Sequence, residues 1–250
     1  TPLNYESSGN GETIVFLHGA LVDQAMWNAQ ADYFKERYRV LTVDLPEHGE
    51  SADTVLNPYC ADTIAQSVME LLDALQIGRF HLCGHSLGGM AAQEIALRHP
   101  KRVRCLVLAE TSYGTGTTAL EKLGTALARL LMLLTTQKQF VRMSANTYGQ
   151  LHESVKLYLE KAMSAYSMKQ CRRVMDAAFR FQSQNRLPAI EHRTLILLAG
   201  KNKQTHGQGM AMQRMIPNAE LAVIPGAHHL LNIDRPAAFN ETVGAFIGLR

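Results

Sequence analysis

The sequence predicts an α/β fold, in which a twisted and mostly parallel β-sheet carries helices on both faces and one helical insertion. The first observation is that short apolar runs alternate with helical patterns in the first and last thirds of the 250-residue chain. The second is a composition of 46% hydrophobic and 19% charged residues, which suits a compact core. The predicted strands are residues 13–18, 39–44, 79–84, 104–110, 194–200 and 220–224.

Helices are predicted where apolar residues recur at steps of three and four. The segments with this pattern are residues 61–75, residues 87–98 and the stretch containing Phe239, Val243, Phe246 and Ile247. Asp234 followed by Pro236 is a typical start for the last of these helices. A strand before Thr13 looks abbreviated, so the prediction leaves one edge of the sheet undefined.

Residues 112–187 interrupt the alternation because no strand-like run occurs there. Two apolar stripes at helical spacing are present instead, one made of Leu120, Leu123, Leu127, Leu130, Leu131 and Leu134 and the other of Cys171, Val174, Met175, Ala178 and Phe179. A connection of this length is typical of a lid over the carboxyl ends of the strands. The alternative is that the stripes pack only against each other. The predicted division is a core of residues 1–111 and 188–250 and a helical cap of residues 112–187.

The charge of the chain is unevenly distributed. The net charge is +3, but residues 112–187 carry 11 Lys and Arg against 4 Asp and Glu, a net of +7, and the remainder carries 14 against 18, a net of −4. The basic residues are scattered along helical patterns without interleaved aromatic residues, so a solvated helix face is a better interpretation than a nucleic-acid surface. The positive segment could favour a substrate that bears a carboxylate.

Several features favour a cytoplasmic protein. No apolar run approaches the roughly 18 to 20 residues that cross a bilayer, and residues 1–11 lack the basic start and apolar stretch of an export signal. The four cysteines, Cys60, Cys83, Cys105 and Cys171, are far apart and show no C-x-x-C spacing, so reduced thiols are expected.

The pattern Gly84-His85-Ser86-Leu87-Gly88 stands between a predicted strand and a predicted helix. A serine on so sharp a turn requires small neighbours, because bulky side chains at positions 84 and 88 would collide with adjacent structure. The turn would raise the Ser86 hydroxyl above the sheet, at the positive end of the following helix. This context predicts a nucleophile, the alternative being a tight structural turn.

The chain resembles the α/β-hydrolase family over nearly its whole length. The stretches that carry the resemblance are residues 16–20, 44–51, 84–89 and 224–230, with Asn232, Asp234 and Pro236 following. Glu47 is a mild departure, since glycine usually occupies its place. The family plan places the catalytic histidine in the loop after the last strand, which implies His229 rather than His228. The resemblance further implies that the backbone N–H groups of Ala20 and Leu87 form an oxyanion hole.

The third member of the expected Ser-His-acid triad is missing from its usual place. The family carries an acid three residues after the glycine that ends the penultimate strand, where this sequence has Lys203, and no Asp or Glu occurs from residue 192 to residue 219. Glu110 ends the strand beside the one that bears Ser86, and haloalkane dehalogenases resemble this arrangement. We therefore predict that Glu110 orients His229. The alternatives are a site without the acid, with Asn202 as an orienting amide, or a Glu110 that faces solvent or a basic residue.

These features predict a serine hydrolase of small or medium carboxylic esters, lactones or related acyl compounds. No phosphate-binding loop or spaced Cys/His set is present, so neither a metal nor an organic cofactor is implied. Serine at position 86 argues against a dehalogenase, whose nucleophile there is an aspartate. The alternatives on the same fold are a non-hydrolytic binding or signalling protein, which Lys203 would permit, and a cofactor-free oxygenase or lyase.

Overall fold

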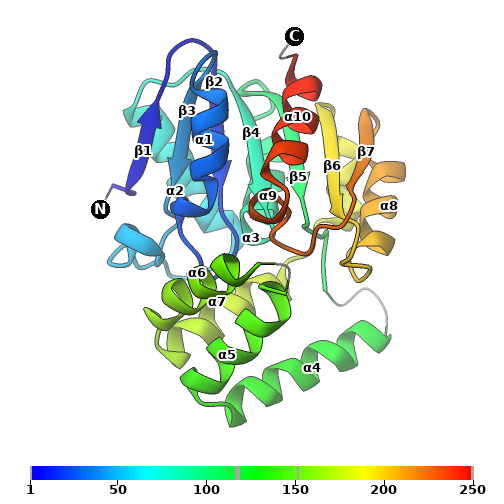
Figure 1. The fold of residues 1–250 in the computed structure, drawn as a ribbon. Helices are drawn as coiled ribbons and strands as arrows, with labels where there is room; N and C mark the ends of the chain where they lie inside the picture. The colour runs from blue at the N-terminus through cyan, green and yellow to red at the C-terminus, as the bar shows by residue number, and fades with distance from the viewer. Residues whose placement is uncertain (1, 116–118, 151, 249–250) are drawn as a thin grey trace.

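A seven-stranded sheet runs through the centre of the molecule (Figure 1). The computed structural model describes residues 2–115, 119–150 and 152–248. The strand order is β1-β3-β2-β4-β5-β6-β7, and neighbouring strands are parallel except for β1, which pairs antiparallel with β3. The strands are β1 (Tyr5–Ser8), β2 (Thr13–Leu17), β3 (Arg39–Val43), β4 (Phe80–His85), β5 (Val103–Ala109), β6 (Arg193–Ala199) and β7 (Ala219–Ile224).

The predicted α/β sheet is confirmed, and each of the six predicted apolar runs overlaps one strand to within one residue at each end. The central strands β2 and β4 are buried at every position, because helices cover both faces of a parallel sheet. The undefined edge is the four-residue strand β1, which is mostly exposed. Its short length and exposure explain why the sequence carries little apolar signal there.

Helices cover both faces of the sheet (Figure 1). Helices α1 (Asn28–Phe34) and α10 (Pro236–Ile247) lie on the face toward the viewer, and α2 (Ala61–Ala74) and α3 (Leu87–Arg98) lie behind. Pro236 occupies the first turn of α10 as predicted, because its missing N–H has no helical partner there. The short helix α9 (Leu231–Asp234) precedes α10, and α8 (His206–Met215) packs against β6 and β7.

In the described residues of the insertion between β5 and β6, four α-helices lie together below the sheet in Figure 1. They are α4 (Ala119–Leu134), α5 (Gln137–Tyr148), α6 (Glu153–Ser164) and α7 (Met168–Arg180). Capping boxes at Thr136 and Ser167 start α5 and α7, since each hydroxyl accepts a hydrogen bond from a backbone N–H of the first turn. Within the described ranges, no helix is both long and apolar enough to cross a membrane.

The two predicted stripes of the insertion have opposite environments. Cys171 and Val174 of α7 are fully buried, but the leucines of α4 are exposed, with Leu127 at 63% and Leu134 at 76%. The alternative that the stripes pack only against each other is therefore wrong for α4. This helix meets α7 through the side that carries Met132, which is buried, and turns the leucines away. The Leu120 side chain lies outside the described part of the chain.

An ion pair between buried Glu47 and partly exposed Arg173 connects the insertion to the loop after β3. Glu47 has a positive φ of 64°, in the left-handed region that favours glycine, and its carboxylate is 5% exposed. Both carboxylate oxygens accept from Arg173 Nε on α7, at 3.0 and 3.1 Å, and Oε1 also accepts from the backbone N–H of Leu56 at 3.1 Å. This pairing gives Glu47 a structural reason to replace the glycine usual in the family.

We predict that Arg173→Met lowers the free energy of unfolding by about 1–3 kcal/mol, because it leaves the Glu47 carboxylate buried without its cation. The matched control is Lys35→Met, which removes the exposed pair with Asp32 and should cost less than about 0.5 kcal/mol. Chemical denaturation at neutral pH measures both. Equal losses for the two variants would contradict the structural role of the Glu47–Arg173 pair.

Candidate active site

Ser86 stands on a sharp turn between β4 and α3. Its φ of 50° and ψ of −114° are strained for a residue with a side chain. A Cβ atom on Gly84 would come within 2.4 Å of the Gly88 carbonyl oxygen, and one on Gly88 within 2.4 Å of the Leu17 carbonyl oxygen. The close approach of these backbones explains why both neighbours of the turn are glycines.

Hydrogen bonds with the end of β5 and the residues after it fix this turn. The Ser86 N–H donates to the carbonyl oxygen of Ala109 at 3.0 Å, and the Thr111 hydroxyl donates to the Ser86 carbonyl oxygen at 2.7 Å. Leu87 begins α3 directly after Ser86, so its backbone N–H belongs to the free N–H groups of the helix N-terminus.

Ser86, His229 and Ala20 line one cavity of about 140 Å³. The other lining residues are mainly apolar, together with the His85 ring and two further residues that carry a hydroxyl, Ser144 and Tyr148: Gly19, Leu21, Val22, His85, Phe140, Ser144, Tyr148, Leu159, Met163, Met175 and Leu230. Helices α5, α6 and α7 of the insertion contribute six of these residues and so form one wall of the cavity beside Ser86. No Lys or Arg is among the described residues that line it. The positive charge of residues 112–187 therefore has no direct contact with this cavity.

The Glu110 side chain is fully buried and its carboxylate is surrounded by donors. Its Oε1 accepts from the Ala199 backbone N–H at 2.6 Å and from the Thr205 hydroxyl at 3.1 Å. Its Oε2 accepts from the Asn202 side-chain amide at 2.5 Å and lies 3.2 Å from His229 Nδ1. Because an ionised carboxylate can only accept, this contact calls for an N–H on His229 Nδ1.

The structure brings together Glu110 and His229, which are 119 positions apart in the sequence. Lys203 is exposed, and its neighbour Asn202 supplies an amide that lies 3.5 Å from His229 Nδ1 and bonds Glu110. Thr205 was missed in the sequence analysis. Its only signal is a hydroxyl next to the start of α8, a pattern too common to indicate a carboxylate partner.

His229 and His228 face different surroundings. The His229 ring packs 5.1 Å from the Tyr148 ring and 4.8 Å from the His85 ring, centroid to centroid. His228 instead turns toward Asp234, since its backbone N–H donates to the Asp234 carboxylate at 2.7 Å and its ring Nδ1 lies 3.7 Å from the same oxygen. Only His229 of this pair lines the cavity.

Three buried histidines hold the turns around the cavity. His18 Nε2 accepts from the Leu45 N–H at 2.9 Å, and His48 Nε2 accepts from the Leu21 N–H at 3.0 Å. His85 Nε2 donates to the His229 carbonyl oxygen at 2.8 Å. Burial lowers the pKa of His48 and of His85 to about 3 and also lowers the pKa of His18. These rings are therefore neutral and support the surrounding turns through hydrogen bonds.

Among the described residues, no three His, Cys, Asp or Glu side chains are close enough together to hold a metal ion. The four cysteines are free thiols. Burial raises the pKa of Cys105 and, well outside its usual range, that of Cys83. Both of these thiols are therefore protonated and unreactive.

The chain belongs to the alpha/beta hydrolase family, whose pattern matches residues 14–242. Over 248 residues it is 27% identical to 3-oxoadipate enol-lactonase 2 of Acinetobacter baylyi, covering 97% of this chain and 92% of the relative. A stretch of 106 residues, 42% of this chain and 40% of the relative, is 39% identical to a pimeloyl-[acyl-carrier protein] methyl ester esterase of Nitrosomonas europaea.

A similar solved structure is that of a hydrolase from Pseudomonas aeruginosa PA01. It matches with a TM-score of 0.87 at 26% identity and covers 98% of this chain and 94% of its own. The named relatives are hydrolases on the same fold. The chain is therefore an enzyme of this family, and its general reaction is hydrolysis.

We predict that acid destabilises the protein through the buried histidines. His48 has a pKa of about 3 in the folded state and about 6.5 when unfolded, so between these values the unfolded chain binds more protons. The free energy of unfolding therefore decreases as the pH is lowered through this range, by up to about 1.4 kcal/mol per pH unit for each such ring.

Denaturation of the wild type and His48→Gln at pH 7 and pH 5 measures this loss. The variant is expected to be less stable at pH 7 and to lose about 1–2 kcal/mol less on acidification, because one titrating ring is gone. The same pH dependence in both proteins would show that His48 is not held neutral by burial.

Proposed function

We propose that this enzyme cleaves a small or medium carboxylic ester, lactone or related acyl compound through Ser86, His229 and Glu110. The observation that carries the proposal is the 3.2 Å contact between Glu110 Oε2 and His229 Nδ1, beside the cavity that Ser86 and His229 both line. A carboxylate at Nδ1 directs the basic Nε2 of the ring toward its substrate side and stabilises the imidazolium once a proton is taken. The enol-lactonase and esterase names of the relatives support the substrate class.

In the proposed reaction, His229 Nε2 takes the Ser86 proton while the Ser86 oxygen attacks the acyl carbon. The Ala20 and Leu87 backbone N–H groups stabilise the negative oxygen of the tetrahedral intermediate. His229 then returns the proton to the leaving alcohol, and an ester of Ser86 remains. Water attacks this acyl-enzyme with His229 again as base, which releases the acid and restores the serine.

The cavity supports a compact and mainly apolar acyl group. Phe140, Met163 and Met175 give it an apolar wall, and its volume of about 140 Å³ leaves little room beside Ser86. The preference for an anionic substrate stays a prediction. The described residues that line the cavity include no Lys or Arg that could bind a carboxylate. Residues 112–187 act in this proposal as a lid, which excludes water from the acyl-enzyme site until substrate or solvent enters.

The proposal predicts that Ser86→Ala and His229→Ala each reduce hydrolysis of a short aryl ester to background. The two groups act as one unit, so the double variant should be hardly slower than either single variant. His228→Ala is the matched control and should retain most activity, because His228 faces Asp234. Labelling of Ser86 by a fluorophosphonate, together with turnover, also separates hydrolysis from a binding role on the same fold.

Persistent hydrolysis by a folded Ser86→Ala protein would show that the nucleophile lies elsewhere. Equal losses at His228 and His229 would remove the basis for choosing between these two histidines. Circular dichroism and thermal unfolding establish that each variant is folded, since a turn hydroxyl contributes little to stability.

The acid assignment predicts that Glu110→Gln lowers kcat by about 10² to 10⁴, because a neutral amide does not stabilise the imidazolium. Adding Lys203→Asp to this variant should restore part of the rate by placing a carboxylate at the position usual in the family. Asn202→Ala should cost less than Glu110→Gln, since it removes one donor and keeps the charge. A fully active Glu110→Gln would refute the assignment and leave Asn202 or an unassisted His229.

A further inference from the structure

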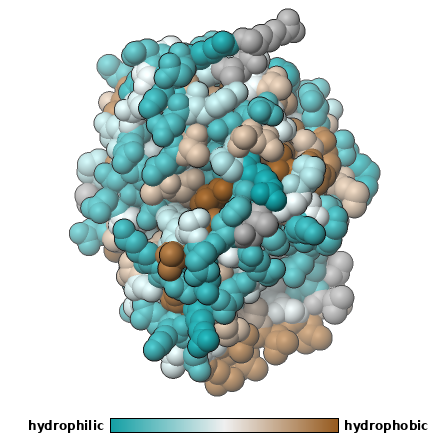
Figure 2. All heavy atoms as spheres, in the orientation of Figure 1, coloured by the Kyte–Doolittle hydropathy of each residue, from teal (hydrophilic) through white to brown (hydrophobic). Residues whose placement is uncertain are grey.

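Helix α4 carries a large apolar face that the rest of the described molecule does not cover. Its exposed leucines range from 49% to 76% exposure: Leu123, Leu127, Leu130, Leu131, Leu133 and Leu134. They form the brown area at the lower end of the molecule in Figure 2. A contiguous apolar surface of this kind is typical of a contact surface rather than of a solvated helix.

The apolar face is continuous along the helix. Leu123, Leu127, Leu130 and Leu134 follow one another at steps of four and three, which aligns them on one side, and Leu131 and Leu133 widen the stripe. The charged residues Glu121, Lys122 and Arg129 fall outside the stripe at this spacing. Met132 packs on the opposite side, toward the molecule. Every leucine in the stripe can therefore meet the same external surface.

The position of α4 suits a flat partner. The helix lies along the lower edge of the molecule in Figure 1, apart from the sheet, with no other element below it in that view. With 16 residues it is about 24 Å long, less than the roughly 30 Å hydrocarbon core of a bilayer. An amphipathic helix of this length lies in the plane of a lipid interface instead of crossing it.

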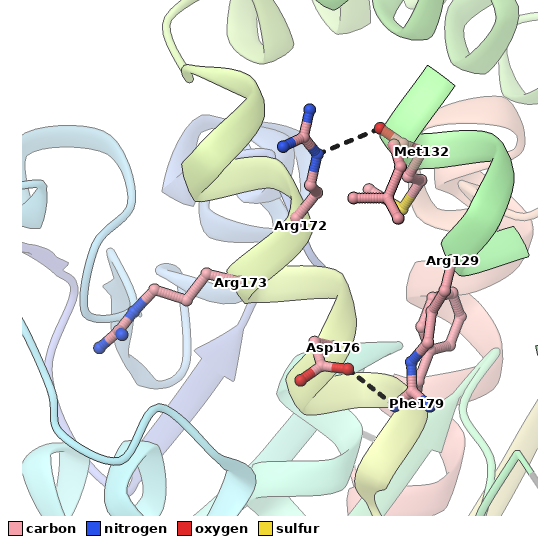
Figure 3. Close-up of a pocket in the computed structure, with 7 residues that line it drawn as sticks. Arg129, Met132, Arg172, Arg173, Asp176 and Phe179 are labelled. Atoms are coloured by element: carbon pink, nitrogen blue, oxygen red, sulfur yellow. Dashed lines mark hydrogen bonds and ion pairs between the residues drawn. The ribbon is translucent and has the colours of Figure 1, made fainter. Parts of the chain in front are cut away.

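Basic side chains border the leucine face. Lys122 and Arg129 lie on one flank of α4, and a cavity of about 300 Å³ between α4 and α7 adds Arg172 (Figure 3). Arg129 pairs with Asp176 at 2.7 Å, and Arg172 uses Nε to hold the Met132 carbonyl oxygen at 3.1 Å. Residues 112–187 carry a net charge of +7, of which +5 remains after Arg173 and Arg186 have paired with Glu47 and Glu94 outside this segment.

We propose that α4 docks this enzyme on an anionic lipid surface. Leucines that enter the interface and cations that approach the headgroups act together in the binding of amphipathic helices. A second copy of the chain is disfavoured as the occupant, because symmetric pairing through α4 would bring two segments of net charge +7 together. An anionic bilayer carries the negative charge that this segment would attract. The inference is independent of the catalytic assignments, since none of the α4 leucines lines the Ser86 cavity.

The test is sedimentation of the protein with vesicles. Wild type should bind vesicles of equimolar phosphatidylglycerol and phosphatidylcholine, with a partition at least about tenfold stronger than for phosphatidylcholine alone, and high salt should weaken it. The triple variant Leu127→Gln/Leu130→Gln/Leu134→Gln should bind the anionic vesicles at least about tenfold more weakly. Gln suits an exposed helix, so circular dichroism and the thermal midpoint should change little.

The matched control is Leu157→Gln on α6, which removes one leucine of 56% exposure outside the α4 face and should change the partition less than about twofold. Leu130→Trp provides a second readout, because the natural Trp27 is fully buried and stays constant. Its fluorescence should shift to the blue with anionic vesicles.

Two results would overturn the proposal. One is a wild type that does not bind anionic vesicles, or that binds them no better than the triple variant. The other is a wild-type dimer in sedimentation velocity that the triple substitution converts to monomer while vesicle binding is absent, which would assign the face to self-association.

Discussion

The hydrogen bonds to the Glu110 carboxylate connect three separate parts of the chain. Glu110 follows β5 with a positive φ of 46°, and its backbone N–H donates to the Leu197 carbonyl oxygen of β6. The turn places the side chain among donors from the end of β6, the loop before α8 and the loop after β7. A buried carboxylate is costly without such donors, so the sheet edge and the His229 loop are positioned by the same group.

The carboxyl edge of the sheet concentrates strain and buried polar groups. Leu21, Glu47, Ser86 and Glu110 all have positive φ values and all lie in turns that follow strands. Neutral rings of His18, His48 and His85 accept from or donate to the backbone of these turns. Strained residues persist only where their surroundings hold them, and here the same hydrogen bonds that stabilise the turns shape the cavity around Ser86.

Residues 112–187 present different chemistry on their two sides. Apolar side chains such as Phe140 and Met175 face the Ser86 cavity, and the Arg173–Glu47 pair fastens the segment to the loop after β3. The outer helix α4 turns its leucines away from the molecule. No Lys or Arg among the described residues of this segment lines the Ser86 cavity. One insertion thus combines an inner surface that lines the Ser86 cavity with an outer apolar surface, which we propose as the lipid-binding face.

Local pattern determined the strands β2 to β7, α2, α3 and the glycine–serine turn, because apolar spacing and backbone crowding act within a few residues. The missing acid near residue 203 could be read directly from the sequence. Helices α1 and α8 were not predicted, since seven and ten residues leave a weak periodic signal. Only the tertiary structure decided that Glu110 and Thr205 meet beside His229 and that the α4 leucines are uncovered. These outcomes depend on contacts between residues distant in sequence, and periodicity shows that a helix has an apolar face without showing what covers it.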